Sequence, residues 1–246
     1  MQTIFDLHTH ILPAMDDGSR SPAQSVQLLR QLAGQGVQTA CATPHYYPWR
    51  ETPREFCLRR QEALEQLAPF LGTEHLPRLK LGAEVAFCPG LSRRADLEPL
   101  ALEGTRTLLL ELPFAPWERA VLDEVTALVL DRRFQVILAH PERLCGFGAN
   151  RAQLDRLAML GLGMQLNADS FCRWHSRKLA LELLQLAPHP LLGSDCHDPT
   201  RRKPRLRKAR QQIARHLGAQ MLQKIDRSSA LYCCQMPHPD TEQERT

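Results

Sequence analysis

Short runs of apolar residues alternate with amphipathic segments along most of this chain. The first apolar run follows Thr3, and others lie at 37–43, 79–83, 107–110, 135–139, 164–168 and 190–193. Between them, apolar residues recur three or four positions apart, at 22–34, 52–71, 116–133, 151–160 and 176–187. Continuous apolar runs predict strands buried on both faces, and the three-to-four spacing predicts helices that pack on them. The alternation therefore predicts an α/β fold with a parallel sheet.

Most of the predicted strands end in a histidine or an acidic residue. The residues at these ends are His45, Glu84, Glu111, His140 and Asp195, with His8 and His10 on the first strand. In a closed barrel the carboxyl ends of the strands converge on one site, whereas an open doubly wound sheet would scatter some of them. The sequence therefore favours a barrel over the open sheet. No Gly-x-Gly-x-x-Gly or Walker-type loop indicates a nucleotide cofactor.

The first strand leads into the stretch TIFDLHTHILPAMDDG, residues 3–18. On a strand, residues two positions apart share a face, so His8 and His10 point the same way. A loop that turns at Gly18 brings Asp17 back over them. A metal site begins in this way, but a His-x-His pair alone is equally compatible with two ordinary polar histidines.

Repetition along the chain turns these residues into a candidate set of metal ligands. The set is His8, His10, Asp17, His45, Glu84, Glu111, His140, Asp195 and His197. Each residue alone is typical of an exposed strand end or a hydrogen-bonded core histidine, and only the clustering of nine indicates chemistry. Imidazole and carboxylate ligands without an obligatory thiolate suit manganese, iron or zinc in a multinuclear site better than a structural zinc site.

The composition is that of a globular protein. Of 246 residues, 43% are hydrophobic and 24% charged. We expect one domain over 1–232 and a poorly ordered tail over 233–246. No window approaches about 18 consecutive apolar residues, and Asp6 and His8 interrupt any signal-peptide core, so we expect a cytoplasmic protein. The eight cysteines form no regular framework and are expected to be reduced, mostly buried thiols.

The net charge of +4 hides a concentration of cations in residues 201–215, here called the basic segment. It carries eight lysines and arginines and no acidic residue. A solvated helix face would explain it, and so would a patch that attracts phosphorylated or acidic partners. No nucleic-acid-binding motif is present, and no nucleic-acid partner is expected.

Several of these residues stand in motifs that resemble those of a known superfamily. The motifs are His8-Thr-His10, Asp16-Asp17-Gly18, Ala42-Thr-Pro-His45, Gly82-Ala-Glu84, Glu111, His140-Pro-Glu-Arg143 and Ser194-Asp-Cys-His197. In their order and spacing over residues 4–217, the chain resembles the PHP (polymerase and histidinol phosphatase) superfamily. Within it, HILPAMDDG and HPER are most similar to the metal-dependent bacterial protein tyrosine phosphatases of capsule and exopolysaccharide biosynthesis loci.

The resemblance implies a distorted (β/α)7 TIM-like barrel with two or three bound metal ions, manganese first, with iron or zinc as alternatives. The nine candidates become metal ligands, Arg143 and Arg202 hold the substrate phosphate, and His197 is also a candidate proton donor. A metal-bridging hydroxide would hydrolyse phosphotyrosine on the tail of a partner bacterial tyrosine autokinase, which regulates polysaccharide synthesis. That kinase would also be the means of recruiting a cytoplasmic protein to the membrane.

Three alternatives stay open. One is a PHP-type small-molecule phosphatase such as histidinol phosphatase, and another is a non-catalytic protein that docks on a kinase through the basic segment. The third is the cysteine-thiolate phosphatase mechanism, in which an arginine lies six positions after the nucleophile, as it does for Cys88 with Arg94 and Cys145 with Arg151. That mechanism needs a phosphate-cradling loop before a helix, and it leaves the nine clustered ligands unexplained.

Overall fold

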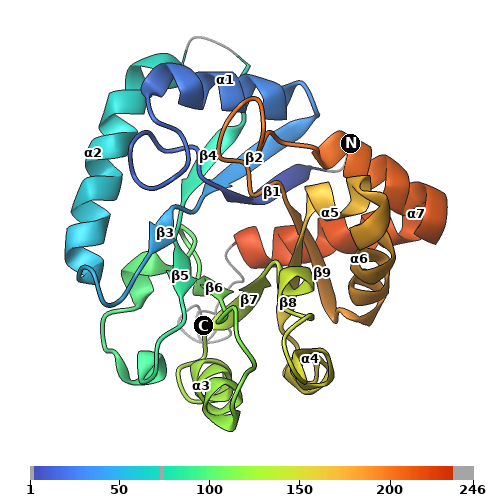
Figure 1. The fold of residues 1–246 in the computed structure, drawn as a ribbon. Coiled ribbons are helices and arrows are strands. Elements are labelled where there is room, and N and C mark those ends of the chain that lie inside the picture. The colour runs from blue at the N-terminus through green and yellow to red at the C-terminus, as the bar shows by residue number, and fades with distance from the viewer. Residues whose placement is uncertain (1–2, 73–74, 235–246) are drawn as a thin grey trace, which may run out of the picture.

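Strands and helices alternate along the chain in the predicted order (Figure 1). The structure, a computed structural model, describes residues 3–72 and 75–234. The strands are β1 (Ile4–Thr9), β2 (Val37–Ala42), β3 (His45–Tyr46), β4 (Arg78–Leu81), β5 (Glu84–Ala86), β6 (Thr107–Glu111), β7 (Gln135–Ala139), β8 (Gly163–Asn167) and β9 (His189–Gly193). The helices are α1 (Pro22–Ala33), α2 (Pro53–Leu71), α3 (Arg119–Leu130), α4 (Asn150–Ala158), α5 (Ala168–Cys172), α6 (Trp174–Leu186) and α7 (Leu206–Cys233). Short 3-10 turns lie at Leu91–Arg93, Glu98–Leu100 and Pro141–Arg143.

The strands form a distorted barrel. All pairs are parallel, in two sheets of order β1-β2-β4 and β3-β5-β6-β7-β8-β9. β3 follows β2, and β5 follows β4, each after a break of two residues. A parallel bridge between Thr9 and Cys196, with a 3.0 Å hydrogen bond from the His10 N–H to the Cys196 carbonyl, joins β1 to the segment after β9. Counted with each broken strand once, the barrel has seven strands, which confirms the predicted fold class.

The two breaks are the main departure from the predicted strands. The sequence predicted strands over 37–43 and 79–83, and pairing does stop near their ends, but it resumes, unpredicted, at His45 and Glu84, which pair with each other. Pro44 has no N–H to give to a sheet ladder. At Gly82 the backbone runs so close to Leu102 that a Cβ would lie 2.6 Å from its Cδ2. The breaks turn the strands so that His45 and Glu84 stand side by side.

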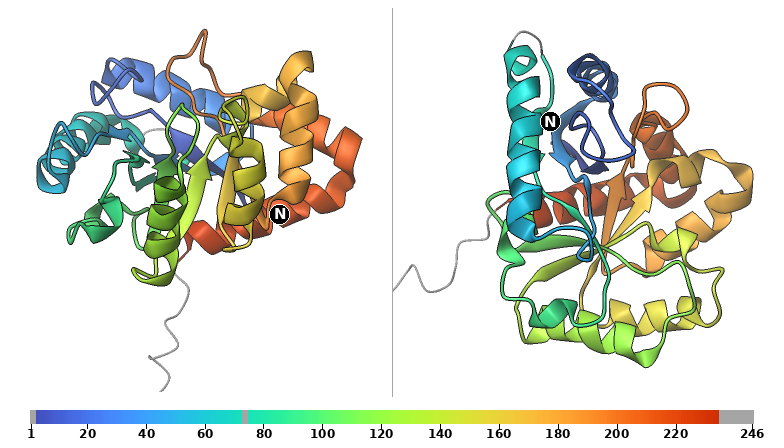
Figure 2. Two further views of the ribbon diagram at one scale, coloured as in Figure 1. Left: turned by 60° about the horizontal axis from the view of Figure 1, so that its bottom comes forward. Right: turned by 60° about the vertical axis from the view of Figure 1, so that its left-hand side comes forward.

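Apolar side chains fill both the inside of the barrel and the layer beneath the helices. The inner cluster consists of Leu7, Cys41, Leu102, Leu109, Ile137, Ala139, Leu191, Tyr232 and Cys233. Its last two members come from α7, which crosses one end of the barrel (Figure 2). Thr107 Oγ1 donates to the Tyr232 carbonyl at 2.9 Å, at the amino end of β6. Because α7 covers the amino ends of the strands, a site at the barrel mouth is left to the carboxyl ends.

Local sequence signals explain how the helices begin. Ser21 caps α1, with Pro22 in its first turn, and Thr52 and Glu55 form a capping box at the start of α2. The run 164–168 ends one residue earlier than predicted, because Ala168 begins the short helix α5. None of the helices within the described residues is long and apolar enough to span a membrane.

The C-terminal region is more ordered than its composition suggested. α7 continues to Cys233, with non-helical backbone at Gly218 (φ 79°). Cys233, the first residue of the expected tail, is helical and buried, while residues 235–246 of that tail lie outside the described residues. We infer that the barrel and α7 form one domain, since α7 contributes to the inner core. The described cysteines are all free, and three of the eight are buried, so the expectation of mostly buried thiols was wrong.

Candidate metal centre

All nine candidate ligands lie at the carboxyl ends of the barrel strands. They are His8, His10 and Asp17 in and after β1, His45 in β3, Glu84 in β5, Glu111 in β6, His140 after β7, and Asp195 and His197 after β9. They come from six different strands or from the loops that follow those strands. Closure of the barrel is therefore what turns a dispersed sequence pattern into one site.

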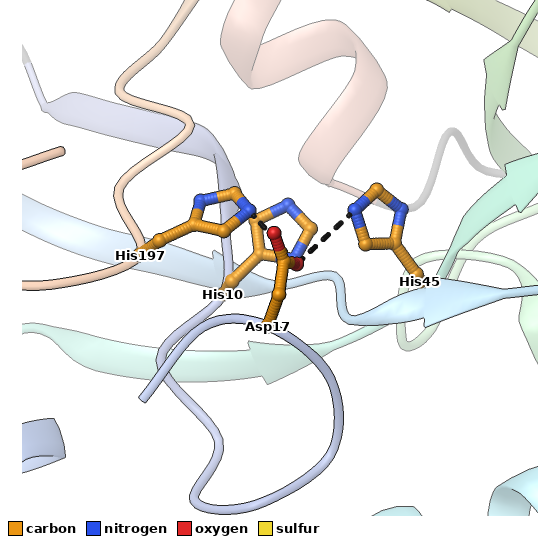
Figure 3. Close-up of side chains that lie close together, drawn as sticks. All are labelled: His10, Asp17, His45 and His197. Carbon is orange, nitrogen blue, oxygen red and sulfur yellow. Dashed lines mark ion pairs between the residues drawn. The ribbon is translucent and has the colours of Figure 1, made fainter. Parts of the chain in front are cut away.

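Four groups of these side chains bring their ligand atoms within 4.8 Å of one another. The groups are His10–Asp17–His45–His197, His8–Glu84–His140, His8–His10–Asp195 and His45–Glu84–Glu111. Figure 3 shows the first group, in which an Asp17 oxygen lies 3.6 Å from His45 Nε2 and 3.3 Å from His197 Nε2. The groups share members, so the nine residues form one continuous cluster.

Glu84 lies at the centre of the cluster and is fully buried. One carboxylate oxygen lies 3.2 Å from His8 Nε2 and 2.9 Å from His45 Nδ1, and the other lies 2.9 Å from His140 Nε2. A buried carboxylate is costly unless cations or hydrogen-bond donors surround it. The position of Glu84 is that of a ligand shared by neighbouring cations.

Hydrogen bonds behind the cluster fix two imidazole rings. His10 Nδ1 donates to Asp16 Oδ2 at 2.6 Å, and His8 Nδ1 donates to Gln165 Oε1 at 2.8 Å. Each ring then turns its Nε2 toward the cluster, and these two nitrogens lie only 3.1 Å apart. Two nitrogens this close need a proton or a metal ion between or beside them. The arrangement fits a metal centre in which outer carboxylates and amides orient the ligating imidazoles.

Several buried polar atoms of the cluster make no well-aligned hydrogen bond in the part of the chain that the structure describes, although an ion-pair partner lies within 4 Å of three of them. They are His45 Nδ1, Glu84 Oε2, His140 Nδ1 and His197 Nε2. Buried polar atoms are nearly always satisfied in folded proteins. Three of these atoms face the ligand groups, and a bound cation would satisfy them, so the residues present fit divalent metal ions.

The electrostatics of the cluster also favour cations. Burial by itself lowers the pKa of His10, but the Asp16, Asp195 and Glu84 carboxylates together outweigh burial and hold that pKa well above its ordinary value. Burial by itself raises the pKa of Glu84, but the surrounding histidines, His8 first, hold it well below its ordinary value. The Asp195 carboxylate, also buried, has its pKa held well below the ordinary value by His10 and His8, so these two carboxylates favour cations. Metal ions compete with protons for the ligand atoms of the cluster.

His197 differs from the other histidines. Burial and the neighbouring His10 lower the pKa of His197 to about 3. Its imidazole is therefore neutral near pH 7, which suits a metal ligand. The remaining N–H of a neutral imidazole is a far weaker acid than an imidazolium, and the proton-donor role considered for His197 on the sequence stays a prediction.

Two arginines line the open edge of the cluster. Arg202 Nη2 lies 3.0 Å from both carboxylate oxygens of Asp195, and its Nη1 lies 3.4 Å from Asp17. Arg143 Nη1 lies 3.6 Å from Asp195. Their side chains are 43% and 45% exposed, so both guanidinium groups can reach a ligand that enters from solvent. Arg202 contacts the cluster. Among the described residues, its basic neighbours Arg201 and Lys203 do not.

Aromatic rings stand on two sides of the mouth. The Tyr47 ring stacks on the His45 ring, with centroids 5.4 Å apart. On the other side, Phe114 is 43% exposed, and the Arg143 guanidinium lies 5.0 Å from its ring centroid. The mouth therefore offers flat apolar surfaces on either side of the polar cluster.

Sequence reasoning missed the residues that orient the ligands. Asp16 accepts from His10 and from the His45 backbone N–H, and Asn167 Nδ2 donates to Asp195 at 2.8 Å. Gln165 Oε1 accepts hydrogen bonds from both His8 Nδ1 and the His140 backbone N–H. The Asp16-Asp17 pair was a usable signal for Asp16. Nothing in the apolar run 164–168 distinguishes Gln165 until the strands are placed side by side.

Neither Cys88 nor Cys145 is set up as a thiolate nucleophile. Burial raises the pKa of Cys88 and raises that of Cys145 to about 11. The loop N–H groups after Cys88 that would cradle a phosphate, at Gly90 and Ser92, already donate to the Glu124 carboxylate at 2.7 and 2.8 Å. Both cysteines therefore lack the low pKa that a thiolate nucleophile needs, and Cys88 also lacks a free anion cradle.

A parallel α/β barrel with a His, Asp and Glu cluster at its carboxyl end is typical of metal-binding barrel proteins. Among known families, the model described as capsular polysaccharide synthesis, CpsB/CapC, matches residues 4–233. The chain belongs to this family. The resemblance seen in the sequence is confirmed at this level.

Named relatives share most of their length with this chain. The tyrosine-protein phosphatase YwqE of Bacillus subtilis is 29% identical over 223 residues, which cover 89% of this chain and 87% of YwqE. The tyrosine-protein phosphatase CpsB of Streptococcus pneumoniae is 23% identical over 90% of this chain and 94% of its own.

Solved structures show the same fold. A chain from crystal structures of YwqE from Bacillus subtilis and CpsB from Streptococcus pneumoniae, described as unique metal-dependent tyrosine phosphatases, superposes with a TM-score of 0.78 at 24% identity, over 94% of both chains. A histidinol phosphate phosphatase from Lactococcus lactis, complexed with zinc, L-histidinol and phosphate, superposes with a TM-score of 0.51 at 16% identity, over 86% of this chain and 92% of its own.

Proposed function

We propose that this protein is a metal-dependent protein-tyrosine phosphatase. The observation that carries the proposal is the continuous cluster of nine imidazole and carboxylate ligands at the barrel mouth, edged by two arginines. Membership of the CpsB/CapC family and the names of the relatives support the same reaction. A non-catalytic docking protein would have no need of a complete ligand set.

The cluster would hold two or three divalent ions. Imidazole and carboxylate donors without thiolate make manganese our first choice, with iron or zinc as alternatives. Bound ions of this kind lower the pKa of water toward neutrality and neutralise charge on a phosphoryl group. His8 and His10 are oriented for the task by Gln165 and Asp16, and Glu84 and Asp195 supply negative charge at the centre.

The remaining roles fall to the arginines and the rim. Arg143 and Arg202 would donate hydrogen bonds to the phosphoryl oxygens and offset the charge that develops on them in the transition state. A phenol, with a pKa of about 10, leaves far more readily than an alkoxide, so the chain needs no strong acid to protonate it. Tyr47 and Phe114 offer apolar faces for an aryl ring held beside the metal ions.

The substrate that we propose is phosphotyrosine on the tail of a partner bacterial autokinase of capsular or exopolysaccharide synthesis. An extended tail can enter an open mouth with half-exposed arginines and aromatic rings, whereas a small metabolite needs to be enclosed on several sides. We place the protein in the cytoplasm, recruited to the membrane through that kinase. The second candidate function is a small-molecule phosphatase, since a histidinol phosphatase shares the fold.

The two candidate functions predict opposite substrate rankings. With manganese bound, we expect kcat/KM for a phosphotyrosine peptide to exceed that for histidinol phosphate by at least about 100-fold, because only the aryl ester has a good leaving group and rings to pack on. Steady-state kinetics on both substrates measures this ratio. A higher kcat/KM for histidinol phosphate would replace the first proposal by the second.

A further inference from the structure

A cavity of about 410 Å³ opens beside the metal cluster, and most of the charged side chains that line it are cationic. It lies between the ends of β8 and β9, the start of α6 and the loop 198–205. Six cationic side chains line it: Arg143, Arg173, Arg201, Arg202, Lys203 and Arg205. Only two carboxylates, Asp169 and Asp195, stand against them in the lining. With histidine neutral, these side chains give the cavity a net charge of +4.

Ion pairs inside the cavity account for four of the six cations. Arg143 and Arg202 pair with Asp195 at its inner end, next to the metal cluster. Arg173 and Arg205 share the Asp169 carboxylate at the outer end, where Arg205 Nε lies 3.0 Å from it. One carboxylate shared by two guanidinium groups leaves one positive charge uncompensated there. Both ends of the cavity thus keep an attraction for anions.

Arg201 and Lys203 are the remaining two cations. Both are exposed, and neither side chain has an ion-pair or hydrogen-bond partner within residues 3–72 and 75–234. Two uncompensated cations that line a concave site, and do not project from a flat surface, act together on one anion. They would be weak individually, because solvent screens each exposed charge.

The loop that carries them is fixed in place. The Asp198 carboxylate accepts from the backbone N–H groups of Arg201 and Arg202, at 2.7 and 3.0 Å. From α1, Gln31 donates to the Pro199 carbonyl at 3.0 Å, and the nearby Gln35 donates to the Pro204 carbonyl at 2.8 Å. The backbone that carries the two cations is therefore held against the barrel, so they face the cavity at a low entropic cost.

We propose, on the basis of the phosphatase function above, that this cavity binds a second anionic group on the peptide that carries the scissile phosphotyrosine. The group is a carboxylate or a phosphoryl group a few residues away, and the substrate class is therefore an acid-rich phosphotyrosine peptide. One phosphoryl group at Arg143 and Arg202 would leave the outer part of the cavity, with Arg201 and Lys203, unneutralised. The basic segment then contributes to substrate choice and is more than a solvated helix face.

Three phosphotyrosine peptides of equal length test the proposal with the manganese-loaded enzyme. They carry glutamate, glutamine or phosphoserine at the same flanking positions. We expect kcat/KM for the glutamate peptide to exceed that for the glutamine peptide about tenfold, mainly through KM, and the ratio to shrink as salt is raised. A phosphoserine peptide that is better still would identify a phosphoryl group as the preferred anion, and an equal one would identify a carboxylate.

In the double variant R201Q/K203Q we expect kcat/KM for the glutamate peptide to fall to about that for the glutamine peptide. Hydrolysis of p-nitrophenyl phosphate should be unchanged. The matched control is K208Q/R215Q, which removes two exposed cations of the same basic segment that do not line the cavity. The control should keep the ratio.

Three results would refute the inference: no acid preference in the wild-type enzyme, a preference that survives R201Q/K203Q, or an equal loss in K208Q/R215Q. If p-nitrophenyl phosphate is hydrolysed while one of these occurs, the inference alone fails. If the manganese-loaded wild-type protein hydrolyses no aryl phosphate, the proposed function fails and this inference with it.

Discussion

His10→Ala and Asp195→Ala are expected to reduce hydrolysis of p-nitrophenyl phosphate to background and to lower the bound metal. His10 belongs to two of the four ligand groups, and Asp195 joins the cluster to both arginines. Loss of either ligand removes a direct metal bond, and a metal ion supplies several kcal/mol of transition-state stabilisation. Activity assays paired with elemental analysis measure both effects, and circular dichroism checks the fold.

The matched control for these variants is Cys145→Ser. Cys145 is half-buried and packs against the apolar core, and among the described residues its thiol hydrogen-bonds to the Pro141 carbonyl, at 3.4 Å. It should keep most of the activity and all of the metal. An inactive Cys145→Ser protein with its full metal content would point to the thiolate mechanism and overturn the metallophosphatase assignment.

Arg143→Ala is expected to lower kcat/KM for an aryl phosphate by about 100-fold, or about 3 kcal/mol, as loss of a charged donor to a transferring phosphoryl group does. Fold and metal content should survive, because the side chain is 45% exposed and lies outside the ligand groups. Arg143→Lys should recover part of the loss, since it restores the charge but not the planar fork.

Arg151→Ala is the matched control for Arg143. Arg151 is another part-exposed arginine on the segment after β7, and it pairs only with Asp155 on α4, at 2.9 Å. Its loss should change kcat/KM little, because exposed ion pairs contribute about 1 kcal/mol or less to stability. Wild-type kinetics for Arg143→Ala would mean that Arg143 is only a surface residue after a strand.

The sequence was informative about the fold because its apolar runs are continuous and well separated. Runs such as 107–110 and 135–139 correspond to β6 and β7 within one residue. The short strands β3 and β5 that follow the breaks were not predictable in this way, since they have only two and three residues and are recognisable only when paired with each other. α7 was also missed in part, because burial of Tyr232 and Cys233 depends on the finished barrel and not on a helical stripe.

The candidate site was predictable for a different reason. The ligands stand in or just after the carboxyl ends of six strands, and barrel closure gathers strand ends whatever the details of packing. The orienting residues were not predictable, because Gln165 and Asn167 are ordinary polar residues of a strand until β8 is placed between β7 and β9. The sequence showed that the basic segment is cationic. Only the fold shows that Arg201 and Lys203 line the cavity, whereas Lys208 and Arg215 do not.

The central claim is that the nine-residue cluster is a metal centre on which hydrolysis depends. The most direct test measures metal content by elemental analysis and aryl phosphate hydrolysis on the same sample, before and after exhaustive treatment with a chelator and again after manganese is added back. We predict two or three ions per chain, loss of activity with the metal, and recovery on readdition. Full activity in protein shown to contain no metal would contradict the account.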